Sequence, residues 1–348
     1  DLLFPGLEVQ AAFPFRITRD ADLEIEEDEA ADLLATIEES VEMRDFGSEV
    51  RLEIDQAVPE RIRDILVHHL GLAPYLIYTL DVPVGMAAVM ELVKRDRPDL
   101  KDRPFVPAVP PAFTLADDLF SVIAQRDVLL YHPYDSFAPV VDFIRAAAHD
   151  PQVLAIKQTL YRVGPNSPVV DALLDARRHD KQVAVLVELK ARFDEENNIA
   201  WARTLEQEGV HVVYGVLGLK THAKICLVVR REREGIVRYV HMGTGNYNPV
   251  TSRVYSDLGY FTADPDLGAD VSDLFNALTG YSRKDHYRRL LVAPRAMRAD
   301  LLARIAREVA HHRAHGDGYL AFKMNALVDR ACIRALYRAA QAGVRVDL

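Results

Sequence analysis

The chain has 348 residues, more than one typical hydrophobic core supports, so two or three domains are expected. Its formal net charge of -10 excludes a general basic field for nucleic acid or anionic lipid, so any anionic substrate needs a local cluster of Lys and Arg. No stretch has the length and apolarity of a membrane span, and the two cysteines, Cys226 and Cys332, indicate reduced core residues of a cytoplasmic protein.

The two ends of the sequence suggest a piece of a longer protein. The first residue is Asp1 rather than Met, and residues 343–348 resemble a strand that stops short. We therefore expect this stretch by itself to be inactive as an enzyme.

Residues 1–108 predict a first domain that mixes helices and strands, an α+β head region. Strands are expected at 13–18 and 50–54, and helices at 30–42 and 59–70. A proline-rich stretch at 103–111 resists regular structure and indicates a domain edge.

Residues 109–290 predict an α/β domain. Apolar strand-like runs at 153–160, 183–189 and 210–214 alternate with helical patterns at 168–178 and 197–208. This alternation favours a sheet with parallel pairs, flanked by helices.

A second, incomplete copy of this unit is predicted over residues 291–348. The segment Leu320-Ala321-Phe322-Lys323 repeats the pattern Leu154-Ala155-Ile156-Lys157, and each is followed by a helical pattern and a Val-x-Val strand. The overall expectation is an α/β protein of mixed sheets, with one catalytic domain and the start of another.

A possible reaction centre is the pair His222 and Lys224, which we expect on a strand-like segment. A neutral imidazole can attack a terminal phosphorus, and an ammonium two residues on lies on the same face of a strand and steadies the transferred charge. The alternative is that His222 is a half-buried histidine on an edge strand, without a catalytic role. The turn at 243–246 argues against it, because its glycines let backbone amides approach an oxyanion and Asn246 can orient an imidazole or bind phosphate.

Two further residues near this hairpin are candidates with open alternatives. His241 can orient His222 or donate to phosphate, or it is a structural His at a strand end. Tyr255 can stack on a base, or it belongs to the core.

Arg162 and Arg192 each follow a predicted strand, and equal spacings of 30 residues separate Arg162, Arg192 and His222. Three successive strand ends would bring them to one edge of the sheet, where guanidinium groups can bind phosphate oxygens. The alternative is a pair of surface charges.

Three acidic residues follow Arg192: Asp194, Glu195 and Glu196. They can hold a hydrated Mg²⁺ ion, or they can stabilise the amino end of the next helix, which we favour for at least two of them.

Taken together, these motifs resemble the polyphosphate kinase family of the first type, whose catalytic domains are similar to the phospholipase D superfamily. The segments that carry the resemblance are Tyr161-Arg162-Val163, Ala191-Arg192-Phe193-Asp194-Glu195-Glu196, Gly218-Leu219-Lys220-Thr221-His222-Ala223-Lys224 and His241-Met242-Gly243-Thr244-Gly245-Asn246-Tyr247-Asn248.

The resemblance implies reversible transfer of the ATP γ-phosphate to a growing polyphosphate chain through a phosphohistidine at His222. It implies nucleotide contact by Tyr255, a second central histidine at His241, and Mg²⁺ positions at Arg162 and Arg192. Because a guanidinium has no lone pair for a cation, we expect these arginines to act on the phosphates that carry the metal.

The implied partners are ATP, ADP and inorganic polyphosphate, without nucleic acid. A homo-oligomer, dimer or tetramer, in the cytoplasm and associated with the membrane, is also implied. The alternatives are a phospholipase D-type phosphodiesterase and a non-catalytic polyanion-binding module. Hydrolysis of a diester is disfavoured because residues 225–229 are apolar where that superfamily has an Asp.

Overall fold

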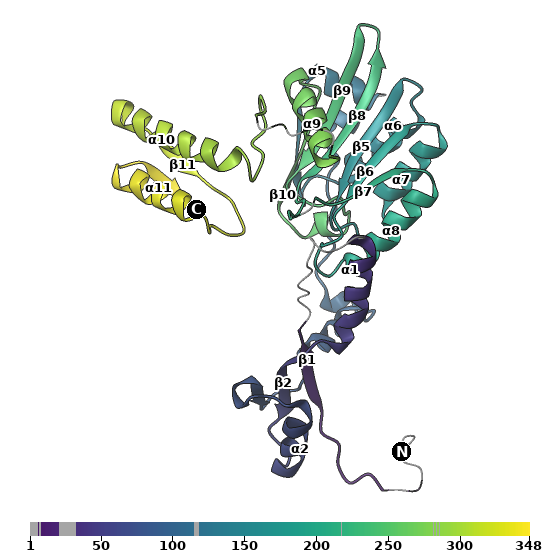
Figure 1. The fold of residues 1–348 in the computed structure, drawn as a ribbon, viewed down its shortest axis with the longest axis vertical. Coiled ribbons are helices and arrows are strands. Elements are labelled where there is room, and N and C mark those ends of the chain that lie inside the picture. Colours follow the sequence, from purple (N-terminus) through teal and green to yellow (C-terminus); the bar gives the residue numbers. More distant parts are fainter. Residues whose placement is uncertain are drawn as a thin grey trace.

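The computed structural model describes residues 6, 8–20, 33–114, 118–216, 218–280, 282, 284 and 286–348. Their strands form a seven-stranded, a three-stranded and a two-stranded sheet. Figure 1 shows the large sheet in the main body, with the three-stranded sheet at one end and the two-stranded sheet to one side.

The seven-stranded sheet has the order β4-β10-β9-β8-β5-β6-β7 and is mixed. Strands β5, β6 and β7 are parallel, whereas β8 runs antiparallel to β5 and the remaining neighbours are antiparallel. The bounds are β4 Val128–His132, β5 Val153–Leu160, β6 Gln182–Val187, β7 His211–Tyr214, β8 Lys224–Glu232, β9 Gly235–Gly243 and β10 Asp257–Thr262.

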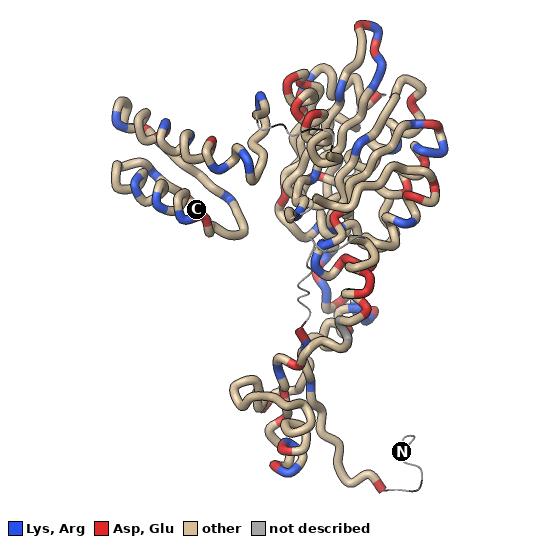
Figure 2. Tube along the Cα trace, viewed as in Figure 1, with Lys and Arg blue, Asp and Glu red and all other residues tan. Residues whose placement is uncertain are grey.

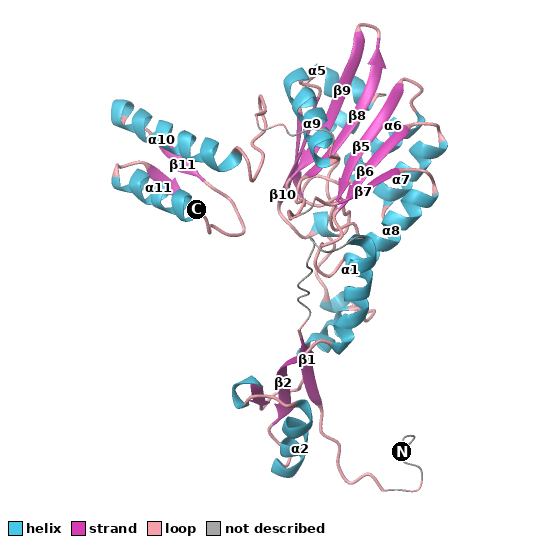
Figure 3. Ribbon diagram, in the orientation of Figure 1, coloured by secondary structure: helices cyan, strands magenta, loops and turns pink. Residues whose placement is uncertain are grey.

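Helices cover both faces of this sheet (Figure 3). Strand β8 shows why, because Cys226 and Val228 pack into the main core while Ile225 and Leu227 pack into a second cluster with α9. Alternate side chains of a strand point to opposite faces, so a strand covered on both sides is apolar throughout. The helices are α5 Leu119–Gln125, α6 Ala138–His149, α7 Pro168–Arg178, α8 Glu195–Gln207 and α9 Pro265–Leu278.

The first part of the chain has its own small core. β1 (Phe15–Arg19), β2 (Glu49–Asp55) and β3 (Ile77–Leu80) form a sheet against α2 (Glu60–Leu70), around the buried Leu52, Ile54 and Leu72. The predicted strands and the helix at 59–70 are confirmed.

Short helical elements occur along the described chain. Two are α-helices, α3 (Met90–Val93) and α4 (Pro111–Thr114). Five are 3₁₀ turns, at Met43–Phe46, Pro74–Leu76, Met86–Val89, Pro98–Leu100 and Thr251–Arg253.

Helix α1 (Leu33–Glu42) belongs to the main body by its packing. Its Ile37 is buried in the main core, and Glu38 forms an ion pair with Arg203 of α8. The helix was predicted from residue 30, and residues 30–32 lie outside the described part of the chain.

The last part contains α10 (Met297–His315), β11 (Tyr319–Ala321), α11 (Arg330–Gln341) and β12 (Arg345–Asp347). β11 and β12 are parallel and joined through α11, which is the same β-α-β arrangement as β5, α7 and β6. The predicted repeat therefore has a structural counterpart. Figure 2 shows acidic and basic residues on all three parts of the chain.

No helix among the described residues combines the length and the apolarity needed to cross a membrane.

Candidate functional site

One edge of the seven-stranded sheet collects the predicted residues. Arg162 and Arg192 lie in loops after β5 and β6, and His222 lies in the loop before β8. Because β8 is antiparallel to β5, its amino end meets the carboxyl ends of β5 and β6. The prediction that His222 lies on a strand is wrong, since β8 begins only at Lys224.

His222 is exposed, and three cations surround it. Partial burial lowers the pKa of its imidazole below the usual value, and Lys224, Lys220 and Arg162 lower it further by repulsion. At neutral pH the ring is therefore uncharged and keeps a nitrogen lone pair. This is the state in which a histidine can act as a nucleophile.

Tyr161 lies at the centre of these charges. Its ring meets that of His222 edge to face, with 4.9 Å between centroids. The cationic groups of Lys224, Arg162 and Lys220 lie 4.8, 5.7 and 5.8 Å from the same ring centroid. An aromatic face attracts cations, so Tyr161 helps to gather positive charge beside His222. Its place directly after β5 was the signal that could have identified it.

Lys224 is the buried cation of the site, with 5% of its surface exposed. Burial lowers the pKa of its ammonium to about 8, Asp257 opposes this shift, and Arg162 adds to it. The Nζ atom donates to the carbonyl oxygen of His222. Asp257, at the start of β10, was not identified from the sequence, since it lies 33 residues from Lys224 along the chain.

The two arginine loops are joined directly. The Nη2 atom of Arg162 donates to the backbone oxygen of Arg192 at 2.9 Å. The guanidinium of Arg192 lies 5.5 Å from the ring centroid of Phe193. Phe193 has a φ of 69°, in the left-handed region that non-glycine residues rarely adopt. Such backbone strain is often found at functional sites.

Glu188 fixes the loop that carries His222. Its fully buried carboxylate accepts hydrogen bonds from the backbone nitrogens of Thr221 at 2.6 Å and Lys190 at 3.1 Å. Burial raises the pKa of this carboxyl group, and the two hydrogen bonds oppose that shift. Its role depends on a contact with Thr221, 33 residues away along the chain, which the local sequence does not report.

Asp194 holds the loops together in another way. It occupies the position before α8, but its carboxylate accepts from the backbone of Gly164 at 3.1 Å and from Asn197 at 3.0 Å. It makes no side-chain capping bond to the helix backbone. Glu195 and Glu196 lie in the first turn of α8, where their negative charges stabilise the helix by interacting with its dipole.

His241 lies in the core, apart from His222. Its Nδ1 atom is 2.8 Å from the hydroxyl of Tyr247, and its ring packs 4.6 Å from that of Phe261. Burial, with a smaller contribution from His132, lowers the pKa of His241 to about 3. His241 belongs to β9, and its described contacts do not include His222.

Asn246 and Tyr255 lie on the loops beyond β9. The Oδ1 atom of Asn246 is buried without a hydrogen-bond partner among the described residues. Tyr255 is 60% exposed, so its ring does not belong to the core. No described contact joins either side chain to His222.

The glycines of the turn are explained by packing. A Cβ atom on Gly245 would lie 2.6 Å from Asp257, and one on Gly243 would lie 3.2 Å from the backbone oxygen of Leu258. The space that a Cβ atom on either glycine would need is therefore filled by the start of β10. The turn instead allows Asp257 to approach Lys224.

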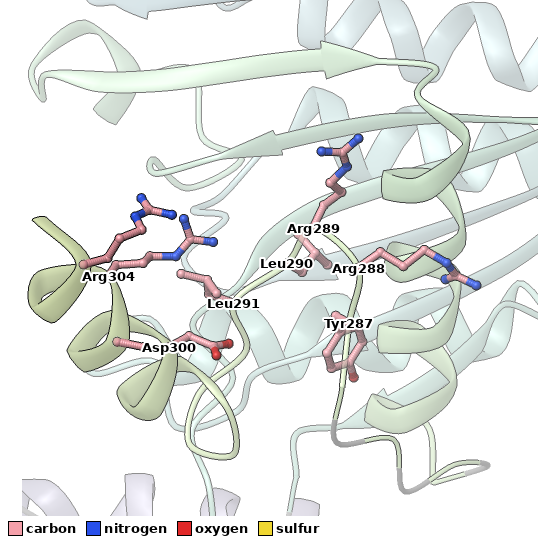
Figure 4. Close-up of a pocket in the computed structure, with 9 residues that line it drawn as sticks. Tyr287, Arg288, Arg289, Leu290, Leu291, Asp300 and Arg304 are labelled. Carbon is pink, nitrogen blue, oxygen red and sulfur yellow. The ribbon is translucent and has the colours of Figure 1, made fainter. Parts of the chain in front are cut away.

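A separate basic pocket lies between the segment after α9 and helix α10 (Figure 4). Arg288 and Arg289 in its wall are paired with Asp270 and Asp266, respectively. The lining residues are Tyr287, Arg288, Arg289, Leu290, Leu291, Asp300, Ala303, Arg304 and Arg307. None of these is a predicted site residue.

Known proteins resemble the chain along its whole length. Family models match residues 1–92 (polyphosphate kinase middle domain), 118–284 (polyphosphate kinase C-terminal domain 1) and 290–348 (polyphosphate kinase C-terminal domain 2).

Two curated relatives are 56% identical: a polyphosphate kinase of Prosthecochloris aestuarii over 346 residues, and polyphosphate kinase 1 of Chlorobaculum tepidum over 347 residues. The alignments cover 99% and 100% of this chain but 48% and 50% of the relatives, so the chain spans about half their length. The crystal structure of a polyphosphate kinase from Porphyromonas gingivalis matches with a TM-score of 0.81 at 31% identity, covering 100% of this chain and 50% of that one.

Proposed function

The chain belongs to the polyphosphate kinase family, and on that basis we propose that it carries the phosphohistidine centre of an ATP–polyphosphate phosphotransferase. One observation carries the proposal above all. An exposed histidine with a lowered pKa, His222, lies among the cations of Lys220, Lys224 and Arg162. A neutral nucleophile within a positive environment suits attack on an anionic phosphate.

The proposed reaction has two displacements. A nitrogen of His222 attacks the γ-phosphorus of ATP, an N–P bond forms, and the bond to the bridging oxygen breaks so that ADP leaves with the electron pair. The terminal oxygen of a polyphosphate chain then attacks the same phosphorus and breaks the N–P bond. Each displacement reverses in the same site, so the transfer is reversible.

The cations have separate roles in this proposal. Lys224 neutralises charge on the transferred group, and Arg162 and Arg192 bind phosphate oxygens on either side of it. Tyr255, exposed on the loop before β10, stacks on the nucleotide base. His241 and Asn246 support the site from β9 and its turn, His241 from a buried position.

Arg162 and Arg192 do not fit the role of Mg²⁺ ligands, because a guanidinium offers no lone pair. In the part of the chain that the structure describes, a cluster of ligating side chains is found at His149, Asp175 and His179, outside this edge. We propose that Mg²⁺ at this site is held by phosphate oxygens of the substrates, which the arginines bind in turn.

We extend the proposal to the organisation of the protein. The division into residues 1–108, 109–290 and 291–348 draws support from a separate core in each of the three sheets, with α1 of the first segment packing into the main core. A cytoplasmic homo-oligomer, dimer or tetramer, that associates with the membrane rests on family membership alone. Light scattering of the purified protein and flotation with anionic vesicles would test both statements.

The direct test is phosphate labelling of the full-length protein with γ-labelled ATP. We expect acid-labile, alkali-stable label on the wild type, and its loss in His222→Ala. His211→Ala, an exposed histidine on β7, is the matched control and should label normally. Acid-labile label on a folded His222→Ala protein would overturn the proposal.

A further inference from the structure

A second group of histidines lies where α6 and α7 pack together. His149 is the last residue of α6, Asp175 lies in the last turn of α7, and His179 directly follows that helix. The Nε2 atom of His149 is 3.2 Å from Asp175, and the two imidazole centroids are 4.5 Å apart. One ligand atom from each residue lies within 4.8 Å of the others. The helices end before β5 and β6 begin, so this group occupies the edge of the sheet opposite His222.

The hydrogen bonds of the two rings orient their lone pairs. The Nδ1 atom of His149 is 3.0 Å from the backbone oxygen of Arg145, and the Nδ1 atom of His179 is 2.9 Å from the backbone oxygen of Asp175. A carbonyl oxygen only accepts, so both Nδ1 atoms must carry the proton. In a neutral ring the lone pair is then on Nε2. Donation of Nδ1–H to a backbone carbonyl is also the usual outer-shell support of a metal-bound histidine.

The carboxylate of Asp175 lies between the two rings. One of its oxygens is 3.2 Å from the Nε2 atom of His149, and the other is 3.5 Å from the Nδ1 atom of His179. Two imidazoles and a carboxylate at this spacing can offer their lone pairs to one divalent ion.

We propose that His149, Asp175 and His179 form a binding site for a transition-metal ion of the zinc class. Two imidazoles and one carboxylate are the donor set that such ions take, with water as a fourth ligand. Neighbouring ligands of a tetrahedral ion with bonds of about 2.0–2.1 Å lie roughly 3.3 Å apart, close to the His149–Asp175 distance of 3.2 Å. His149 and His179 have 60% and 47% of their side chains exposed, so an ion can reach them from solvent.

A metal ion here would connect the ends of two helices that cover the main core. Because the ion binds the folded arrangement, it stabilises the protein in proportion to its concentration. The site lies away from the proposed phosphohistidine, so we infer a structural role that is independent of phosphoryl transfer.

The test uses the full-length protein after removal of metals with a chelator. Co²⁺ is titrated at pH 7.5 and followed by visible absorption, and Zn²⁺ by calorimetry and by the thermal unfolding midpoint. We expect one ion per chain with tetrahedral Co²⁺ bands. His149→Gln, His179→Gln and Asp175→Asn should each weaken binding by at least about tenfold, since loss of an outer-shell partner alone costs roughly that much.

His211→Gln serves as the matched control, because it removes an exposed histidine from β7 and should bind like the wild type. The midpoint in the absence of metal shows whether each variant is folded. A wild type that binds no Co²⁺ or Zn²⁺ would overturn the proposal, as would equal affinity in the three site variants.

Discussion

At the scale of single residues, the proposed phosphoryl transfer needs two side chains in opposite charge states. His222 has to be neutral to attack. Because its pKa is lowered, the imidazole stays neutral at pH values below the ordinary pKa of histidine. Lys224 has to be charged to neutralise phosphate, and its pKa of about 8 lets it lose the proton in mildly alkaline solution. Activity is therefore expected between the lowered pKa of His222 and about pH 8.

The alkaline limit should depend on Asp257. Its negative charge raises the pKa of Lys224, so Asp257→Asn should move the alkaline fall of kcat/KM to lower pH. Lys224→Arg should remove this limit, because arginine stays charged. Asp142→Asn, an exposed carboxylate on α6, should leave the profile unchanged. An unshifted profile in Asp257→Asn would exclude Lys224 as the titrating group.

Tyr161 should act through its ring rather than its hydroxyl. Tyr161→Phe keeps the aromatic face beside Lys224 and His222 and should retain the labelling rate within about twofold. Tyr161→Leu removes a cation–π interaction worth about 1–2 kcal/mol, so labelling should slow by roughly tenfold. Rapid-quench labelling of both variants measures this difference, and equal rates would contradict the role.

At the scale of elements, helix α8 connects the strand ends that carry the site. The Nδ2 atom of its buried Asn198 donates to the backbone oxygens of Tyr161, just after β5, and Glu188, just after β6. The carboxylate of Asp194 accepts a hydrogen bond from the backbone nitrogen of Gly164 in the same loop region. The amino end of α8 therefore holds the loops after β5 and β6, and a substitution there should loosen both loops.

Asn198→Asp tests this connection. The substitution keeps the size but places an acceptor against two carbonyl oxygens, which should cost about 2–4 kcal/mol of unfolding free energy and slow labelling of His222. Urea denaturation measures the cost. Asn276→Asp is the matched control, because its Oδ1 accepts from Lys157 and a carboxylate can do the same.

At the scale of the whole molecule, the main core reaches beyond the central segment of the chain. Helix α1 precedes β2 in sequence, yet Ile37 is 1% exposed within the main core. The small sheet of β1, β2 and β3 keeps a separate core around Leu52 and Ile54. The first 108 residues thus contribute to two cores.

This division can be measured by unfolding. Ile37→Ala leaves a cavity in the main core and should destabilise it by about 2–4 kcal/mol. Ile65→Ala on α2 removes a side chain that is 48% exposed and should cost less than about 1 kcal/mol. Calorimetry resolves the two effects, and a negligible loss in Ile37→Ala would mean that α1 is not part of the main core.

The sequence by itself determined the local elements and the family, and it contains the histidine that we propose to react. Strand 153–160 and helix 168–178 were predicted with their observed bounds, because hydrophobic periodicity and turn residues report local structure. The resemblance at His222, Lys224, Arg162 and Arg192 rests on motifs that the sequence contains directly.

Only the tertiary structure decided which groups meet. The antiparallel pairing of β8 with β5 brings the loop of His222 beside Arg162. The antiparallel pairing of β10 with β9 brings the charge of Asp257 to bear on Lys224. Tyr161, Glu188 and Asn198 act through contacts between loops distant in sequence, and His241 turns into the core instead of toward His222. Strand order depends on long-range packing, which periodicity within one segment does not report.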